Sequence, residues 1–240
     1  MNLAVDIGNS SAKFAVFDGN EKITVFRTLT LPYKKLKKKF SSYKIERVII
    51  SSVKKIPADL MDGFTADVQS VHLLSHKSRL PFQNLYQTPE SLGTDRIAAV
   101  AGAFNIFPGS EVLVIDAGTA ITYDFLSGEV YKGGNISPGL EMRFKALNSF
   151  TGKLPLVTPK AGYSFPGRTT AEAISAGVIT GLIYEINEYI RTFEKDHAVA
   201  KILLTGGNGE FLKDKLQKQH LYLPDLVMEG LNFILDYNAK

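Results

Sequence analysis

Two segments of the chain place an aspartate, a glycine and a hydroxyl residue directly after an apolar run. Residues 4–18 read AVDIGNSSAKFAVFD and residues 114–126 read VIDAGTAITYDFL, with Asp6 and Asp116 at the ends of the apolar stretches. Glycine lets the backbone turn tightly and brings amide N–H groups close to a bulky anion. A carboxylate can stand beside phosphates when it holds Mg²⁺, which bridges the phosphate oxygens. The repeated pattern therefore predicts that two similar loops bind a phosphorylated ligand together with a cation.

The first of these loops has neutral hydrogen-bonding groups in place of a Walker lysine. Gly8 is followed by Asn9, Ser10 and Ser11, which do not repel oxyanions. Lys13, on the strand that follows, can help to neutralise phosphate charge. Neither GxxxxGK(S/T) nor GxGxxG occurs in the chain, so the P-loop and Rossmann interpretations lose their main support.

The apolar periodicity alternates between strand-like and helical segments along the whole chain. It predicts strands at 2–7, 12–17, 22–28, 46–52, 69–74, 111–116, 119–126, 129–136 and 201–207. It predicts helices at 34–39, 94–107, 139–149, 169–194, 208–218 and 224–236. Strands and helices therefore alternate as they do in α/β proteins.

One arrangement of these elements occurs twice. A strand, Asp-x-Gly, a second strand, a glycine turn and a third strand follow one another at 2–28 and again at 111–136. We therefore expect an α/β fold in which two halves share a similar mixed central sheet, with a cleft between them. The expected division is residues 1–109 and 110–240.

The composition indicates a globular protein with an ordinary core, because 45% of the 240 residues are hydrophobic and 22% are charged. There is no run of 18 apolar residues, and the N-terminus lacks a signal-peptide pattern, so we expect a cytoplasmic protein without a membrane span. The absence of cysteine excludes disulfides and thiolate metal sites. Much of the net charge of +4 comes from KKLKKK at 34–39. We interpret this run as a solvated face, with an anion or nucleic-acid patch as the alternative.

Six motifs, in order over nearly the whole chain, are those of a known family. They are DIGNSS, LGTDR, DAGTAITYD, GGNISPG, GRTTAEAI and TGG. On these motifs the chain resembles type III pantothenate kinase, a member of the actin, sugar kinase and Hsp70 superfold with duplicated ribonuclease H-like (actin-like ATPase) domains. The resemblance implies ATP-dependent phosphorylation of pantothenate to 4'-phosphopantothenate, the first step of coenzyme A biosynthesis. It also implies a homodimer that requires Mg²⁺ and a monovalent cation, K⁺ or NH₄⁺, and we expect no nucleic-acid partner.

The resemblance also assigns roles to residues, position by position. The ATP-binding residues are Asp6, Ile7, Gly8, Asn9, Ser10, Ser11, Ala12 and Lys13, with Thr119 as a second ATP contact. The substrate-binding residues are Tyr86, Gly93, Thr94, Asp95, Arg96 and Thr170, with Asp95 as the proton acceptor. Asp116 is assigned to the monovalent cation, and Asp6 is the carboxylate expected to hold Mg²⁺.

Two positions depart from the family pattern. Ser10 stands where the family has threonine, and this change keeps the hydroxyl group. The segment Gly167-Arg168-Thr169-Thr170 stands where the family has Gly-Arg-Asn-Thr. Thr169 therefore replaces an asparagine, which changes the hydrogen-bonding groups beside Thr170.

Asp95 and Arg96 have the residue types that a kinase acting on a primary alcohol needs. A carboxylate can orient the hydroxyl and take its proton, and a positive group can neutralise an acidic substrate or developing charge. Thr94 and Asp95 are also helix-start signals. The alternative is therefore that Asp95 only caps a helix while Arg96 points to solvent. Together with the other motifs, the pair favours the catalytic interpretation.

Several features have a second interpretation. A different kinase or a polyphosphate hydrolase of the same superfold would use the same ATP loops with another acceptor site. A regulator of transcription would use the lysine run for salt-sensitive DNA binding, but the GTDR segment then has no evident purpose.

The glycine pair in LTGGNGE at 204–210 either admits a flat adenine or ribose or serves only as a turn. His72 and His76 lack the glutamate of HExxH, so zinc binding is not expected.

Overall fold

The computed structural model describes residues 1–159, 162–197 and 200–239. The chain forms two compact units. The first consists of Met1–Ser110, Leu126–Gly133 and Asp225–Lys240, and the second of Glu111–Phe125 and Gly134–Pro224. The C-terminal segment belongs to the first compact unit, although the expected halves, residues 1–109 and 110–240, assign it to the second. The division into those halves stays a prediction.

The first unit is built on a five-stranded mixed sheet. Its strands are β1 (Asn2–Ile7), β2 (Ala12–Asp18), β3 (Glu21–Thr28), β4 (Arg47–Ser52) and β5 (Ser70–Leu73), in the order β3-β2-β1-β4-β5. β1, β2 and β3 are antiparallel neighbours, whereas β1, β4 and β5 run parallel. Since parallel strands end at the same edge of a sheet, the last residues of β1 and β4 lie next to each other.

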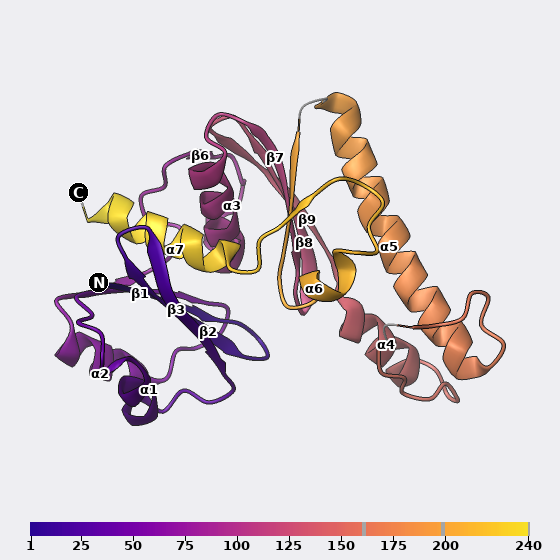
Figure 1. The fold of residues 1–240 in the computed structure, drawn as a ribbon, viewed down its shortest axis with the longest axis horizontal. Helices are drawn as coiled ribbons and strands as arrows, with labels where there is room; N and C mark the ends of the chain where they lie inside the picture. Colours follow the sequence, from indigo (N-terminus) through magenta and orange to yellow (C-terminus); the bar gives the residue numbers. More distant parts are fainter. Residues whose placement is uncertain (160–161, 198–199, 240) are drawn as a thin grey trace. The chain divides into compact units, whose positions relative to one another are not determined.

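Helices cover both faces of this sheet (Figure 1). Leu3, Val5 and Ile7 of β1 pack in one core with α1 (Tyr33–Phe40) and α2 (Ala58–Asp67). On the opposite face, Asn2 donates a hydrogen bond to Asn232 of α7 (Leu226–Asn238), which packs against α3 (Thr94–Ile106). Successive side chains of a strand point to opposite faces. Asp6 therefore lies on the face of the sheet that α3 and α7 cover.

The lysine run forms the exposed side of α1. Leu36 and Phe40 of this helix are buried, while Lys37 forms an ion pair with Asp67 of α2 at 2.5 Å. The ammonium of Lys39 lies 5.0 Å from the centre of the Phe26 ring. These local partners agree with the interpretation of the run as a solvated face of an amphipathic helix.

The second sheet repeats the strand order of the first. It contains β7 (Glu111–Ala117), β8 (Ala120–Ser127), β9 (Val130–Pro138), β10 (Lys201–Thr205), β11 (Leu221–Tyr222) and β6 (Gln83–Asn84), in the order β11-β10-β7-β8-β9-β6. Read from β9, the order β9-β8-β7-β10-β11 corresponds to β3-β2-β1-β4-β5. β7 and β10 run parallel, as β1 and β4 do. The predicted duplication of an α/β core with mixed sheets is confirmed.

Two helices of the second unit pack on its sheet. Leu113 and Ile115 of β7 share a core with Phe144 of α4 (Leu140–Ser149) and with Ile179 and Ile186 of α5 (Thr170–Asp196). In the described part of the chain, no helix is long and apolar enough to cross a membrane.

Some predicted boundaries were wrong. The helix expected at 208–218 is only α6 (Gly209–Leu212), because Leu212 is the last fully buried side chain of that segment. The helix α2 was not predicted, and only Leu60 and Phe64 of it are buried, which leaves a weak apolar pattern. The two-residue strands β6 and β11 and the short 3₁₀-helix η1 (Pro89–Ser91) were also missed. Elements this short have no readable period.

Candidate active site

The loop between β1 and β2 has the form expected of an anion-binding turn. The N–H of Gly8 donates to the carbonyl of Ser11 at 3.0 Å and closes the loop, while Asn9 and Ser10 are exposed. Ile7 and Ala12, both assigned to the ATP loop, have buried side chains. They can therefore offer only backbone groups to a ligand. Side-chain contacts with a ligand would come from the residues between them, 8–11.

Asp6 is the last polar side chain of β1 before this loop. In the sheet it is paired in register with Lys13 of β2 and with Ser51 of β4. Burial and the nearby negative charge of Asp95 raise the pKa of Asp6 to about 6, against the opposing effects of Ser51, Lys13 and Arg27. A cation bound at this carboxylate would offset both effects that raise the pKa.

Ser51 joins Asp6 to the start of α3. Its hydroxyl is fully buried and donates to Oδ1 of Asp6 at 3.1 Å. The hydroxyl of Thr94 lies 3.0 Å from the same Ser51 oxygen. Since Ser51 has one proton and gives it to Asp6, Thr94 is the donor of the second bond. This chain of hydrogen bonds links Asp6, at the start of the loop that is predicted to bind ATP, to the residue next to Asp95.

Ser51 was missed in the sequence analysis. The segment RVIISS shows an apolar strand that ends in hydroxyl residues, which was the available signal. Using it would have required knowing that β4 lies beside β1.

Gly93 leaves space for the carboxylate of Asp95. Gly93 is the N-cap residue of α3, and a Cβ atom there would lie 2.4 Å from Oδ1 of Asp95. The same oxygen accepts a hydrogen bond from the N–H of Arg96 at 2.9 Å. The side chain of Asp95 is thereby turned back over the start of the helix. Any residue larger than glycine at position 93 would displace this side chain.

Arg96 does not point to solvent. It is only 4% exposed, and its guanidinium lies 5.5 Å from the centre of the Tyr86 ring. Tyr86 in turn stacks on Tyr131 at 6.4 Å between ring centres. The structure therefore brings Tyr86 and Arg96 together, and it places Asp6, Thr94 and Asp95 within one hydrogen-bonded and electrostatic cluster of the first unit.

Asp116 is the second-to-last residue of β7 in the second unit, as Asp6 is of β1 in the first. It is paired in register with Thr205 of β10, just as Asp6 is paired with Ser51. Gly206, with a positive φ of 91°, brings the backbone so close that a Cβ atom there would lie 2.3 Å from Oδ1 of Asp116. The TGG motif is thus packed directly against this carboxylate. Its role as a site for adenine or ribose stays a prediction.

Thr119 is exposed in the turn between β7 and β8. Its carbonyl accepts a hydrogen bond from the N–H of Gly139 at 3.1 Å, and the N–H of Asn208 donates to the carbonyl of Ala117 at 2.8 Å. The side chain of Asn208 also donates to Glu141 at 3.0 Å. The GGNISPG and TGG segments are therefore tied to the loop that holds Asp116 and Thr119.

Thr170 is the first residue of α5, and Thr169 caps this helix. Oγ1 of Thr169 accepts from the N–H of Glu172 at 3.2 Å, and Glu172 accepts from the N–H groups of Thr169 and Arg168. This capping box satisfies N–H groups that the helix start leaves unpaired. Threonine and asparagine both serve as N-cap residues, so the departure at position 169 retains a group that can order the backbone beside Thr170.

The residues described by the structure include no group of three or more His, Cys, Asp or Glu side chains arranged to hold a metal ion. Asp6 still fits Mg²⁺, because it supplies a hard carboxylate oxygen and this ion usually takes only one or two carboxylates beside phosphate and water oxygens. For Asp116 the structure gives one carboxylate with the backbone at Gly206 packed against it, and its assignment to a monovalent cation stays a prediction.

A family model described as type III pantothenate kinase matches residues 2–192. The chain is 45% identical over 242 residues to a type III pantothenate kinase of Phocaeicola vulgatus, covering 100% of both chains. It is 42% identical over 243 residues to one of Christiangramia forsetii, covering 99% of both.

Among solved structures, the chain is similar to a Campylobacter jejuni protein whose name assigns it to the Baf family of transcriptional activators. The TM-score is 0.64 at 24% identity, with 99% of this chain and 98% of that one covered. A Listeria monocytogenes protein named for N-acetylmannosamine kinase has a TM-score of 0.57 at 12% identity, with 100% and 99% covered. These likenesses show the sugar kinase and actin-like ATPase fold alone, so neither name extends to this chain.

Proposed function

Because the chain belongs to the type III pantothenate kinase family, we propose that Asp95 is the residue that orients and deprotonates the acceptor hydroxyl of pantothenate. The enzyme is a kinase that transfers phosphate to an alcohol, in coenzyme A biosynthesis. ATP is the donor that such a kinase uses. The product of the proposed transfer is 4'-phosphopantothenate.

The observation that supports this proposal is the cluster at the ends of β1 and β4. Asp95 lies near enough to Asp6 for its charge to raise the pKa of Asp6. Ser51 and Thr94 connect the same two segments by hydrogen bonds. A residue that served only the start of α3 would need no place beside Asp6 and the β1–β2 loop.

In the proposed reaction, Asp95 accepts the proton of the pantothenate hydroxyl as the bond from that oxygen to the γ-phosphorus forms. The bond between this phosphorus and the leaving oxygen of ADP breaks in the same step. Little proton transfer is needed early, because the transition state of phosphoryl transfer is loose. Arg96 and Tyr86 bind the substrate, and the backbone N–H groups and hydroxyl groups of residues 9–11 bind phosphate oxygens.

Asp6 would hold Mg²⁺ together with phosphate oxygens of the nucleotide. When bound, this ion supplies positive charge at the phosphate oxygens during transfer. Thr119 is proposed as a second ATP contact and Thr170 as a further residue for the substrate. The cytoplasmic location and the absence of a nucleic-acid partner stay predictions.

We expect K⁺ or NH₄⁺ to raise the rate severalfold over Na⁺ alone. The reason is that Asp116, a carboxylate near the end of β7, is proposed to hold a second cation that does not bridge the phosphates. The measurement is a coupled assay of ADP release with pantothenate, ATP and Mg²⁺, in the three chloride salts at equal ionic strength. In the Asp116→Asn variant, the rates in the three salts should be equal. Equal rates in all three salts with the parent enzyme would contradict the assignment.

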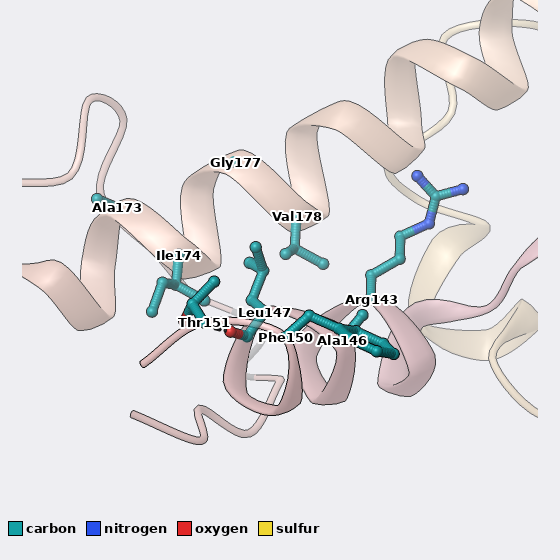
Figure 2. Close-up of a pocket in the computed structure, with 9 residues that line it drawn as sticks. All are labelled: Arg143, Ala146, Leu147, Phe150, Thr151, Ala173, Ile174, Gly177 and Val178. Carbon is teal, nitrogen blue, oxygen red and sulfur yellow. Dashed lines mark hydrogen bonds between the residues drawn. The ribbon is translucent and has the colours of Figure 1, made fainter. Parts of the chain in front are cut away.

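We also propose that the enzyme is a homodimer that pairs through the exposed face of α5. Ala173 and Gly177 of this face line a pocket of about 620 Å³ with residues of α4 (Figure 2). Phe150, at the rim, is 89% exposed, and Tyr184 continues the exposed face along α5. Exposed apolar surface of this kind often marks a contact with another protein.

The dimer can be tested with Gly177→Glu. A Cβ atom at position 177 meets nothing within 4 Å, so the monomer should fold normally, whereas a buried charge should oppose pairing. Sedimentation is expected to show a dimer for the parent and a shift toward monomer for the variant. Thr30→Glu, at an exposed position after β3 and outside α5, is the control and should stay dimeric. A parent enzyme that sediments as a fully active monomer at assay concentration would rule the dimer out.

A further inference from the structure

The ammonium of Lys13 is held by a residue that lies far away in the sequence. Nζ of Lys13 lies 2.6 Å from Oδ1 of Asp225, and the two side chains are only 12% and 17% exposed. Asp225 is the residue at which the chain returns to the first unit, directly before α7. The lysine expected to help with phosphate charge is therefore fixed by the start of the C-terminal helix.

The sheet explains why these two residues meet. Lys13 is paired in register with Asp6, so both side chains lie on the face covered by α3 and α7. Asp225 begins α7 but makes no side-chain hydrogen bond to its own helix. Its second oxygen binds Lys22 at 2.6 Å, so this carboxylate holds one ammonium group on each oxygen.

The pKa of Asp225 is consistent with this pairing. Burial by itself would raise the pKa of Asp225, but the hydrogen bonds from Lys13 and Lys22 outweigh it and hold the pKa below its usual value. Lys22 has a further acidic neighbour in Glu229 at 3.5 Å. Without Asp225, two ammonium groups would lie close together with one negative charge fewer between them, and their repulsion would displace Lys13.

We propose that Asp225 is a positioning residue, which holds the Lys13 ammonium beside the β1–β2 loop for the terminal phosphates of ATP. The inference rests on the proposed role of that loop in ATP binding. A lysine side chain loses much rotamer freedom when it is fixed to a ligand. Asp225 fixes the Lys13 side chain before ATP binds, so less side-chain entropy is lost in the binding step.

The test is Asp225→Asn, which keeps the size of the side chain and remains a good residue at a helix start. The KM for ATP is expected to rise about tenfold, in the range of coupling energies between contacting residues. The KM for pantothenate should stay within about twofold, because the ion pairs that the structure describes for Asp225 are with Lys13 and Lys22. Asp225→Glu should recover part of the ATP affinity. An unchanged KM for ATP with a lower Tm would show a purely structural role, and a fall in that KM would show that Asp225 competes with ATP for Lys13.

Two further variants separate this inference from the proposed function. Glu229→Gln removes an acid that contacts only the Lys22 side of the cluster and should leave the KM for ATP unchanged. Lys13→Met should raise the KM for ATP, and adding Asp225→Asn to it should produce no further rise. If Lys13→Met has no effect, the phosphate role of Lys13 is wrong. If Lys13→Met has its effect but Asp225→Asn does not, only the positioning role is wrong.

Discussion

Replacing Asp95 by Asn is expected to lower kcat by about 10²–10⁴, the usual range for loss of a positioned general base. The change keeps the size of the side chain and removes the negative charge that is proposed to orient the hydroxyl and accept its proton. Oδ1 of Asn can still accept the hydrogen bond from the N–H of Arg96, so Tm should change little. The measurement is steady-state kinetics with both substrates varied. The KM for ATP should change little, because residues 6–13 and Thr119 are proposed to hold the nucleotide.

Glu90→Gln provides the matched control for Asp95→Asn. Glu90 is an exposed acid in η1, shortly before Asp95 in the chain, and its loss should leave kcat unchanged. If Asp95 is only part of the helix start, kcat of Asp95→Asn will lie within about threefold of the parent, which is too small a change for a general base. A loss of ATP binding in the variant would instead place Asp95 in the nucleotide site.

Asp6→Asn is expected to abolish most activity while it stabilises the ligand-free protein at neutral pH. Loss of the carboxylate that is proposed to hold Mg²⁺ at the reacting phosphate should lower kcat/KM by about 10²–10³. The pKa of Asp6 is about 6 in the folded protein, above its ordinary value of 3.8, so ionisation of this group opposes folding. Allowing for its partial exposure, the variant should gain about 1–2 kcal/mol at pH 8.

The sign of this effect fixes its pH dependence. Because the pKa of Asp6 is raised in the folded protein, protonation of Asp6 favours folding. This contribution to the free energy of unfolding is fully present below about pH 4 and is lost as the pH rises through about 6. The Tm of Asp6→Asn should therefore exceed that of the parent by more at pH 8 than at pH 5. The Tm values of the variant and the parent are measured at both pH values without nucleotide or Mg²⁺. Ser51→Ala keeps the charge of Asp6 and removes the hydrogen bond that Ser51 donates to it. This variant should have a lower Tm than the parent. If Asp6→Asn is the less stable protein at pH 8, the hydrogen bond from Ser51 outweighs the cost of the buried charge.

The sequence by itself determined the features that depend on neighbouring residues. The loop from Asp6 to Lys13, the turn at Gly128 and the start of α3 all follow from local backbone preferences, and the structure has each of them at the expected position. The duplicated order of strands was also predictable, because Asp-x-Gly and the hairpin recur at nearly the same spacing. The resemblance to one kinase family rested on motifs of this local kind, and the comparisons confirm it.

Only the tertiary structure decided which of these local features meet. The strands β1 and β4 are joined by a long crossover, so no local rule places Ser51 beside Asp6. The same holds for Asp225, whose contact with Lys13 depends on α7 returning to the first unit rather than staying with the second. The buried position of Arg96 likewise requires the ring of Tyr86 above it. Side-chain alternation fixes the face on which a residue lies, but the packing of distant helices on that face determines its partners.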